Sequence, residues 1–320
     1  MSVKLFQKIT EDQSPVTAML ILMFLVTAGG ALLLYIFLWS GTLLFSTDIR
    51  LWFVPSWEMG GPDYRMLKYL QLSQQVSFFL VPSLMLIFLY RRTSAGFVLA
   101  GRKIRIAEII AVILLALLAI SITRWTGIVN SKLALPDLFS GIEGWLRQKE
   151  ERAILITARL MEMPDFLSFF SNLFVLAFIP ALSEEMIFRG VLQQLFNRIF
   201  RSEHVAVWCT AVIFSTVHLQ FYGFIPRLIL GLLFGYLFLW SGNISVPVIA
   251  HFVNNGMVIG ISFFSGLGNQ VLNAEELKGE KILAPPVIQI VLFLFLLFLL
   301  RRNYLRRITA EGMEGEGVGK

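Results

Sequence analysis

Cysteine and charge are scarce in this chain of 320 residues, and both shortages exclude classes of protein. The single cysteine, Cys209, cannot form an internal disulfide or a cysteine-based zinc site. Charged residues make up 15% of the chain, against about 25% in typical soluble domains. Because hydrophobic residues make up 57%, the composition excludes a secreted disulfide scaffold, a disordered chain and an ordinary cytosolic enzyme. It indicates a polytopic membrane protein.

Apolar runs long enough to cross a bilayer recur along the chain. A spanning helix needs about 20 mostly apolar residues. The sequence therefore predicts an all-α polytopic membrane protein with about eight transmembrane helices, at residues 17–45, 70–90, 106–122, 166–200, 205–220, 224–240, 244–264 and 286–300. We expect the mixed-charge stretch 124–164 to form an extramembrane loop or surface helices, and the polar tail 301–320 to fray.

The basic residues indicate how the chain is oriented. The net charge of +6 could suggest a nucleic-acid partner, but the basic residues cluster beside apolar segments, as in cytoplasmic membrane loops. With eight spans, the basic segments 91–105 and 301–307 lie on one side. We therefore predict a lipid bilayer environment in the cell (plasma) membrane, cytoplasmic N- and C-termini, and no nucleic-acid partner.

Two adjacent carboxylates, Glu184 and Glu185, directly follow the apolar run 173–182. A charge near a bilayer centre costs about 2.5–3.5 kcal/mol on insertion scales, so such a group usually faces a partner or a cavity. In a helix, Glu185 and Arg189 are i,i+4 neighbours with the acid on the N-terminal side, which is the favourable order. Since Glu184 points about 100° away, we predict that Glu185 pairs with Arg189 and that Glu184 faces something else.

Two histidines occupy similar apolar settings further along the chain. His218 lies four residues after Phe214 and shares its helix face. His251 is followed by Asn254 and Asn255, at i+3 and i+4, and spacing alone does not choose between these two amides.

These side chains are expected to lie at one depth in the membrane. If the fourth and fifth spans form a hairpin that turns near Arg201, Glu184 and His218 are each 17 residues from the turn. That distance is about 25 Å, of which about 10–15 Å lies inside the bilayer. His251 follows the turn at 241–243 and reaches a similar depth on the same side. The prediction is therefore an intramembrane cavity that contains one carboxylate and two imidazoles.

Two kinds of chemistry suit this set. Glu184, His218 and His251 could ligate a divalent metal ion, with zinc the expected ion, and leave one position for a reactive water. Alternatively, Glu184 and His218 could deprotonate a water directly, while His251 and an asparagine donate to the oxyanion. Both options predict hydrolysis of an acyl bond inside the membrane without a covalent nucleophile.

The three groups together resemble the motifs of the CPBP family of CAAX proteases and bacteriocin-processing enzymes, also called Abi. The family motifs are E-E-x-x-x-R, F-x-x-x-H and H-x-x-x-N/D, and the chain has them at 184–189, 214–218 and 251–255. The match covers about residues 172–260. The resemblance implies a metal-dependent intramembrane endopeptidase of the type II CAAX prenyl protease kind, with a membrane-associated peptide or protein as its substrate.

The resemblance also implies residue roles and a division of the chain. By analogy, Glu184 and His218 activate water, His251 and Asn255 act as ligands or transition-state stabilisers, and Glu185 and Arg189 support them. We divide the chain into residues 1–165 with the first three helices and a connecting loop, a catalytic helical core at 166–265, and 266–320 with the last helix and a polar cytoplasmic tail.

Two other functions are compatible with the same residues. A non-catalytic membrane immunity or chaperone-like protein could retain the motifs for stability. A proton-coupled transporter could use buried Glu and His as a proton relay. Transporters usually contain repeats and broken helices in both halves, whereas the ionisable cluster here is confined to one half.

Overall fold

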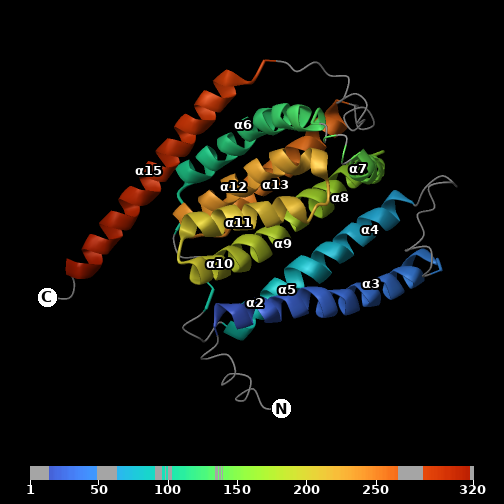
Figure 1. Cartoon of the computed structure of the whole chain (residues 1–320), viewed down its shortest axis with the longest axis horizontal. Helices are drawn as coiled ribbons and strands as arrows, with labels where there is room; N and C mark the ends of the chain where they lie inside the picture. The colour runs from blue at the N-terminus through green and yellow to red at the C-terminus, as the bar shows by residue number, and fades with distance from the viewer. Residues whose placement is uncertain are drawn as a thin grey trace, which may run out of the picture.

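The computed structural model is a single bundle of long helices that run side by side (Figure 1). The structure describes residues 14–48, 63–90, 96, 97, 99, 103–133, 136, 138, 140–265 and 284–317, with side chains described up to residue 306. Its described residues form helices and no strands, as predicted. Across the bundle, α15 lies on one edge beside α6, the pair α12 and α13 follows, and α2 with α3 lies on the opposite edge (Figure 1).

The α-helices have these bounds: α2 Pro15–Phe24, α3 Gly30–Phe45, α4 Tyr64–Gln74, α5 Val81–Tyr90, α6 Ile106–Ser131, α7 Ser140–Leu160, α8 Phe166–Asn172, α9 Ile179–Ile187, α10 Gln193–Phe200, α11 Glu203–Thr216, α12 Phe224–Ser241, α13 Ser245–Phe264 and α15 Val287–Gly317. Short π-helical segments join successive helices into longer rods, at Leu25–Gly29, Gln75–Leu80, Leu173–Phe178 and Phe188–Leu192.

Seven helices of the described chain are long and apolar enough to cross a membrane, which is close to the eight predicted. They are Pro15–Phe45, Tyr64–Tyr90, Ile106–Ser131, Phe166–Phe200, Phe221–Ser241, Ser245–Phe264 and Val287–Arg306. The predicted span at 205–220 is absent from this set because α11 has only 14 residues. The chain is a membrane protein with a helical core.

Two helix ends differ from the prediction. Helix α6 continues to Ser131, beyond the predicted end at residue 122. Helix α15 continues through the polar tail to Gly317, where fraying from residue 301 was expected. Arg, Leu, Ala, Met and Glu have high helix propensity, so this tail extends the helix although it is no longer apolar. Of the predicted basic segment, Arg91, Arg92 and Arg102 lie outside the described residues.

Two hydrophobic clusters flank the middle of the bundle. One joins buried side chains of α6, α12, α13 and α15, including Leu115, Phe234 and Ala250. The other joins α2, α5, the rod at 166–200 and α11, including Leu86 and Phe214. The polar side chains described below lie where these clusters meet, since Phe214 and Phe234 both contact that site.

Helices α11 and α12 pack closely because glycine occupies their interface. A Cβ atom on Gly231 would stand 3.1 Å from both Cα and Cβ of Ala211. At Gly235, it would stand 2.9 Å from Cγ1 of Val207. The G-x-x-x-G spacing at 231–235 therefore permits the close approach of the two helices.

We expect Gly231→Ala to lower the free energy of unfolding by about 1–3 kcal/mol, because the new methyl group overpacks against backbone. Thermal unfolding of the detergent-solubilised protein measures this change. Gly260→Ala is the matched control, since a Cβ on Gly260 meets no atom within 4 Å. Equal melting temperatures for the two variants would show that the α11–α12 contact tolerates a methyl group.

Candidate active site

One long rod carries both carboxylates of the first motif. The rod runs from Phe166 to Phe200, and its middle helix α9 contains Glu184 and Glu185. π-helical segments interrupt its regular turns on both sides of α9, at Leu173–Phe178 and Phe188–Leu192. Such segments occur frequently at functional sites. The rod ends at Arg201, which has φ 52°, and α11 then runs back along α10, so the predicted hairpin is confirmed.

The predicted pair of Glu185 and Arg189 is confirmed. Nη1 of Arg189 donates to Oε1 of Glu185 at 2.8 Å, and both side chains have zero exposure. The same Oε1 is 2.9 Å from Nδ1 of His251 on α13. Glu185 therefore connects the first motif to the third.

Arg189 is held by groups from several helices. Its Nη2 donates to the carbonyl of Gly231 on α12 at 2.9 Å. Its guanidinium carbon lies 4.8 Å from the ring centroid of Phe214 and 5.5 Å from that of Phe234. Arginine tolerates such a site because its planar cation stacks on aromatic faces while its N–H groups bond to acceptors.

Glu184 has a different hydrogen-bond partner from its neighbour Glu185, as the helix geometry predicted. Its Oε1 accepts a hydrogen bond from Nε2 of Gln75 at 2.9 Å. Its Oε2 lies 4.0 Å from Nε2 of His251, and among the described residues it accepts no hydrogen bond. The side chain is buried, with 6% of the residue exposed. One carboxylate oxygen is thus available to a small molecule such as water.

His218 lies in the turn after α11 and not within the helix that the sequence predicted. Its Nδ1 is 2.7 Å from the carbonyl oxygen of Phe214, one of the last carbonyls of α11. If Nδ1 carries the proton and donates to that carbonyl, Nε2 presents a lone pair. Electrostatic interactions connect His218 to Glu184 and His251.

The ring of Phe214 contacts both histidines. Its centroid is 5.2 Å from that of His218 and 6.1 Å from that of His251, in edge-to-face geometry. Phe234 stacks on the ring of His251, with the two ring centroids 4.9 Å apart. The aromatic residue of the second motif therefore packs against both imidazoles, and its carbonyl fixes one of them.

The two asparagines of the third motif bond to each other. Nδ2 of Asn254 donates to Oδ1 of Asn255 at 3.2 Å, and Nδ2 of Asn255 contacts the carbonyl of Leu176 at 3.4 Å. Asn254 is the more buried, with 9% exposure. Asn255 has a second amide N–H without a partner among the described residues. This N–H can serve as the hydrogen-bond donor that the sequence predicts at this position.

The geometry gives mixed support to the predicted zinc site. Each imidazole has its Nδ1 hydrogen-bonded to an oxygen, which is how metal-ligating histidines are usually oriented. However, no three His, Cys, Asp or Glu side chains in the described parts of the chain are grouped closely enough to hold a metal ion. Zinc bound to Glu184, His218 and His251 therefore stays a prediction, and the side chains do not fit it as they stand.

Sequence reasoning missed Gln75, the first residue of the π-helical segment that continues α4. Besides donating to Glu184, Gln75 accepts a hydrogen bond from Oγ of Ser183 at 2.6 Å. Gln75 and Ser183 are both buried. Two adjacent glutamines, Gln74 and Gln75, follow one another near the start of an apolar run, and this pattern could have indicated a buried polar contact. The partner of Gln75, Glu184, is 109 residues away in the chain, so the sequence does not identify it.

We expect Gln75→Ala to reduce the proposed peptidase activity about 10- to 100-fold. This is the range seen when a residue that hydrogen-bonds to a reactive side chain and orients it is removed. The physical reason is that the Glu184 carboxylate loses the donor that orients it. Gln74→Ala is the matched control, because Gln74 is exposed on the same helix. Initial rates for the two variants, normalised to inserted protein, test the prediction; equal rates contradict it.

The segment of the chain that carries this site is similar to known proteins. Residues 166–257 match the family model described as type II CAAX prenyl endopeptidase Rce1-like. The resemblance to type II CAAX prenyl endopeptidases is confirmed. The Rce1-like segment includes all three motifs and lies inside the predicted core at 166–265.

Two curated relatives also match. A membrane-embedded CAAX protease, MroQ of Staphylococcus aureus (strain USA300), is 30% identical over 152 residues, which cover 46% of this chain and 53% of the relative. An uncharacterized protein, YpbD of Bacillus subtilis (strain 168), is 33% identical over 86 residues, 26% of this chain and 41% of the relative. The matches thus span about half of each relative or less. No solved structure matches the chain significantly. The Rce1-like match supports a membrane endopeptidase.

Proposed function

We propose that the chain is an intramembrane endopeptidase that hydrolyses peptide bonds of membrane-associated substrates, CAAX-type tails among them. The observation that carries this proposal is the buried carboxylate of Glu184. Its Oε2 accepts no hydrogen bond from the described residues and lies 4.0 Å from Nε2 of His251. His218 interacts electrostatically with the same carboxylate. A carboxylate and an imidazole that both present lone pairs are suited to deprotonate a water.

The proposed reaction begins with a water held between Glu184 and His218. Oε2 of Glu184 accepts a proton as the water oxygen attacks the carbonyl carbon of the peptide bond. Nε2 of His218 accepts a hydrogen bond from the second O–H of the same water and so orients it. The Phe214 carbonyl fixes the imidazole. When the C–N bond breaks, the proton held by Glu184 passes to the leaving amine nitrogen.

The third motif is proposed to stabilise the oxyanion that forms on the carbonyl oxygen. The second N–H of Asn255 is one donor, and each such donor can contribute about 10²–10³ in kcat. His251 has its Nδ1 directed at Glu185, so its Nε2 donates only when the ring is an imidazolium. Glu185 and Arg189 are proposed to support this ring and not to touch the substrate.

The experiment that tests the proposal uses the purified full chain in liposomes. A library of membrane-anchored peptides, with and without a C-terminal prenylated cysteine, is incubated with it, and the products are identified by mass spectrometry. We expect internal peptide bonds to be cut. The proposal fails if correctly inserted protein cleaves no peptide, and the non-catalytic or transporter interpretation then becomes the better account.

A chelator series decides the proposed role of zinc. If Glu184, His218 and His251 hold a catalytic ion, prolonged dialysis against a chelator should abolish cleavage, and stoichiometric zinc should restore it. If the carboxylate and the imidazole suffice, full activity should persist in metal-depleted protein. Cytoplasmic termini in the plasma membrane belong to the same proposal, and reporter fusions at both ends of the chain test them.

A further inference from the structure

A second charged group lies close to the proposed catalytic residues and has no role in the scheme above. Arg227, on the first turns of α12, interacts electrostatically with Glu184 and His218. Its Nη2 donates to Oε1 of Gln220, two residues after His218. Its Nη1 is buried and has no hydrogen-bond partner among the described residues. A buried cationic N–H without an acceptor is costly, so its presence suggests an acceptor that is bound only part of the time.

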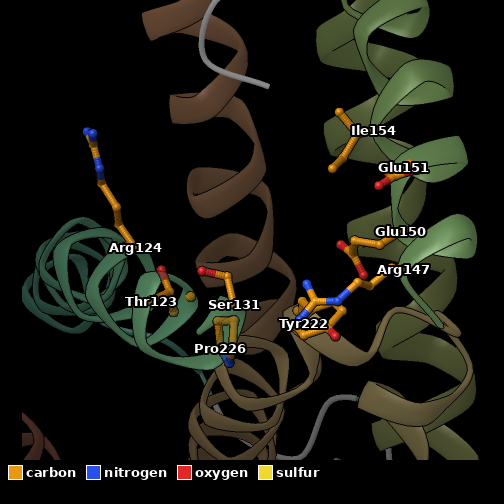
Figure 2. A pocket seen from close by; sticks show the side chains of 11 residues that line it. Thr123, Arg124, Ser131, Arg147, Glu150, Glu151, Ile154, Tyr222 and Pro226 are labelled. Carbon is orange, nitrogen blue, oxygen red and sulfur yellow. The ribbon is translucent and has the colours of Figure 1, made fainter. Parts of the chain in front are cut away.

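The chain makes room for this guanidinium. Gly223 packs against Arg227 so closely that any Cβ at position 223 would collide with Nη1. Gly223 also lines a cavity of about 240 Å³ between α6, α7 and the start of α12, and that cavity is lined by Thr123, Glu150, Tyr222 and Pro226 among others (Figure 2). Arg227 therefore lies directly behind one wall of a cavity large enough for several atoms of a peptide.

Gln220 connects Arg227 to an acid on α7. While its Oε1 accepts from Arg227, its Nε2 is 3.5 Å from Oε1 of Glu150, at the long limit of a hydrogen bond. Oε2 of Glu150 is buried without a close hydrogen-bond partner among the described residues. Burial raises the pKa of this carboxyl, although Arg227 and a backbone hydrogen bond from Tyr222 oppose the shift. Glu150 is thus a poorly satisfied counter-charge for Arg227, which a better-placed carboxylate can replace.

We propose that Arg227 binds a carboxylate of the peptide substrate and thereby sets how far from that carboxylate the chain is cut. The inference rests on the proposed endopeptidase function. Arginine is suited to this role because its fork of N–H groups matches a carboxylate. Because Arg227 interacts electrostatically with Glu184, a carboxylate held by Arg227 fixes the position of the peptide relative to Glu184. The carboxylate comes from a free C-terminus or from an acidic side chain.

The test compares peptides that differ in one carboxylate. Both pairs of peptides are based on a sequence that the protein cleaves. The two peptides of the first pair differ only in the C-terminus, which is a free acid in one and an amide in the other. The two peptides of the second pair differ only in one residue on the C-terminal side of the cut, which is Asp in one and Asn in the other. We expect the binding carboxylate to lower KM about tenfold or more in one of the pairs, which identifies its source. Arg227→Gln should remove that preference. The matched control is Arg198→Gln, which removes a partly buried arginine at the other end of the bundle.

A second variant, Glu150→Gln, tests the proposal even if Arg227→Gln does not fold. Glu150→Gln changes only the competing acid on α7, so it should lower KM more for the carboxylate peptide than for the matched amide peptide. The proposal is overturned if the wild type cuts both members of both pairs equally, if Arg227→Gln keeps the preference, or if Glu150→Gln leaves the ratio of KM values unaltered.

Binding to a catalytically silent protein separates the two proposals. Labelled acid and amide peptides are titrated onto Glu184→Gln protein in liposomes, with and without Arg227→Gln. Tighter binding of the acid that depends on Arg227 supports the anion site even if no peptide is ever hydrolysed by the wild type. Hydrolysis by the wild type without any such binding preference refutes the anion site and leaves the proposed endopeptidase intact.

Discussion

Glu184→Gln should reduce peptide cleavage by about 10²–10⁴-fold, the contribution usually made by a positioned general base. An amide has the shape of the carboxylate, and its oxygen can still accept the hydrogen bond from Gln75, so the helix packing is unchanged. Only the ability to take a proton from water is lost. Initial cleavage rates in liposomes, with protein amount matched by immunoblot, measure the effect.

Glu162→Gln is the control for the loss of one carboxylate. Glu162 pairs with Arg159 at 2.6 Å, and both side chains are partly exposed. We expect its rate to stay within twofold of the wild type, since exposed pairs contribute only about 0–1 kcal/mol. If Glu184→Gln retained wild-type activity, the water-activation scheme would be wrong, and a retained structural motif would explain the residue better.

Arg189→Met should lower the free energy of unfolding by about 3–5 kcal/mol, the cost of leaving the other partner of a buried pair uncompensated. Glu185 has zero exposure, and its Oε2 has no partner in the described structure, so the carboxylate cannot find water when Arg189 is removed. Thermal unfolding in detergent measures the change. Activity should also fall, because His251 is held by the same carboxylate oxygen.

The double variant Glu185→Gln with Arg189→Met isolates the charge effect. With both charges absent, much of the lost stability should return, because no uncompensated ion remains in the core. Activity should remain low, since the amide oxygen is a weaker acceptor for Nδ1 of His251. A double variant as unstable as Arg189→Met alone would indicate that packing of the arginine, and not its charge, holds this part of the bundle together.

The local part of the site was predictable because it follows from helix geometry. The spacing of Glu185 and Arg189 alone predicts their contact, and the 100° offset predicts that Glu184 has other partners. These relations need only that the segment is helical, which its apolar composition favours.

The remaining features depend on where helices end and how they dock. Apolar composition continues past Thr216, yet α11 stops there, and Leu219 takes φ 52° in the turn that follows. Gln75 is as polar as many exposed residues, and its neighbour Gln74 is exposed, so only the docking of the π-helical segment Gln75–Leu80 on α9 selects it. Similarly, the connection from Arg227 through Gln220 to Glu150 needs three elements to meet.

The most direct test of the account is a double-mutant cycle on Glu184 and His218. Cleavage rates are measured for Glu184→Gln, His218→Asn and the double variant, with matched insertion into liposomes. If both residues act on one water, each single variant should lose most of the activity, and the double variant should be about as slow as the slower single. Losses that multiply, or a His218→Asn protein that cleaves at the wild-type rate, would contradict the account.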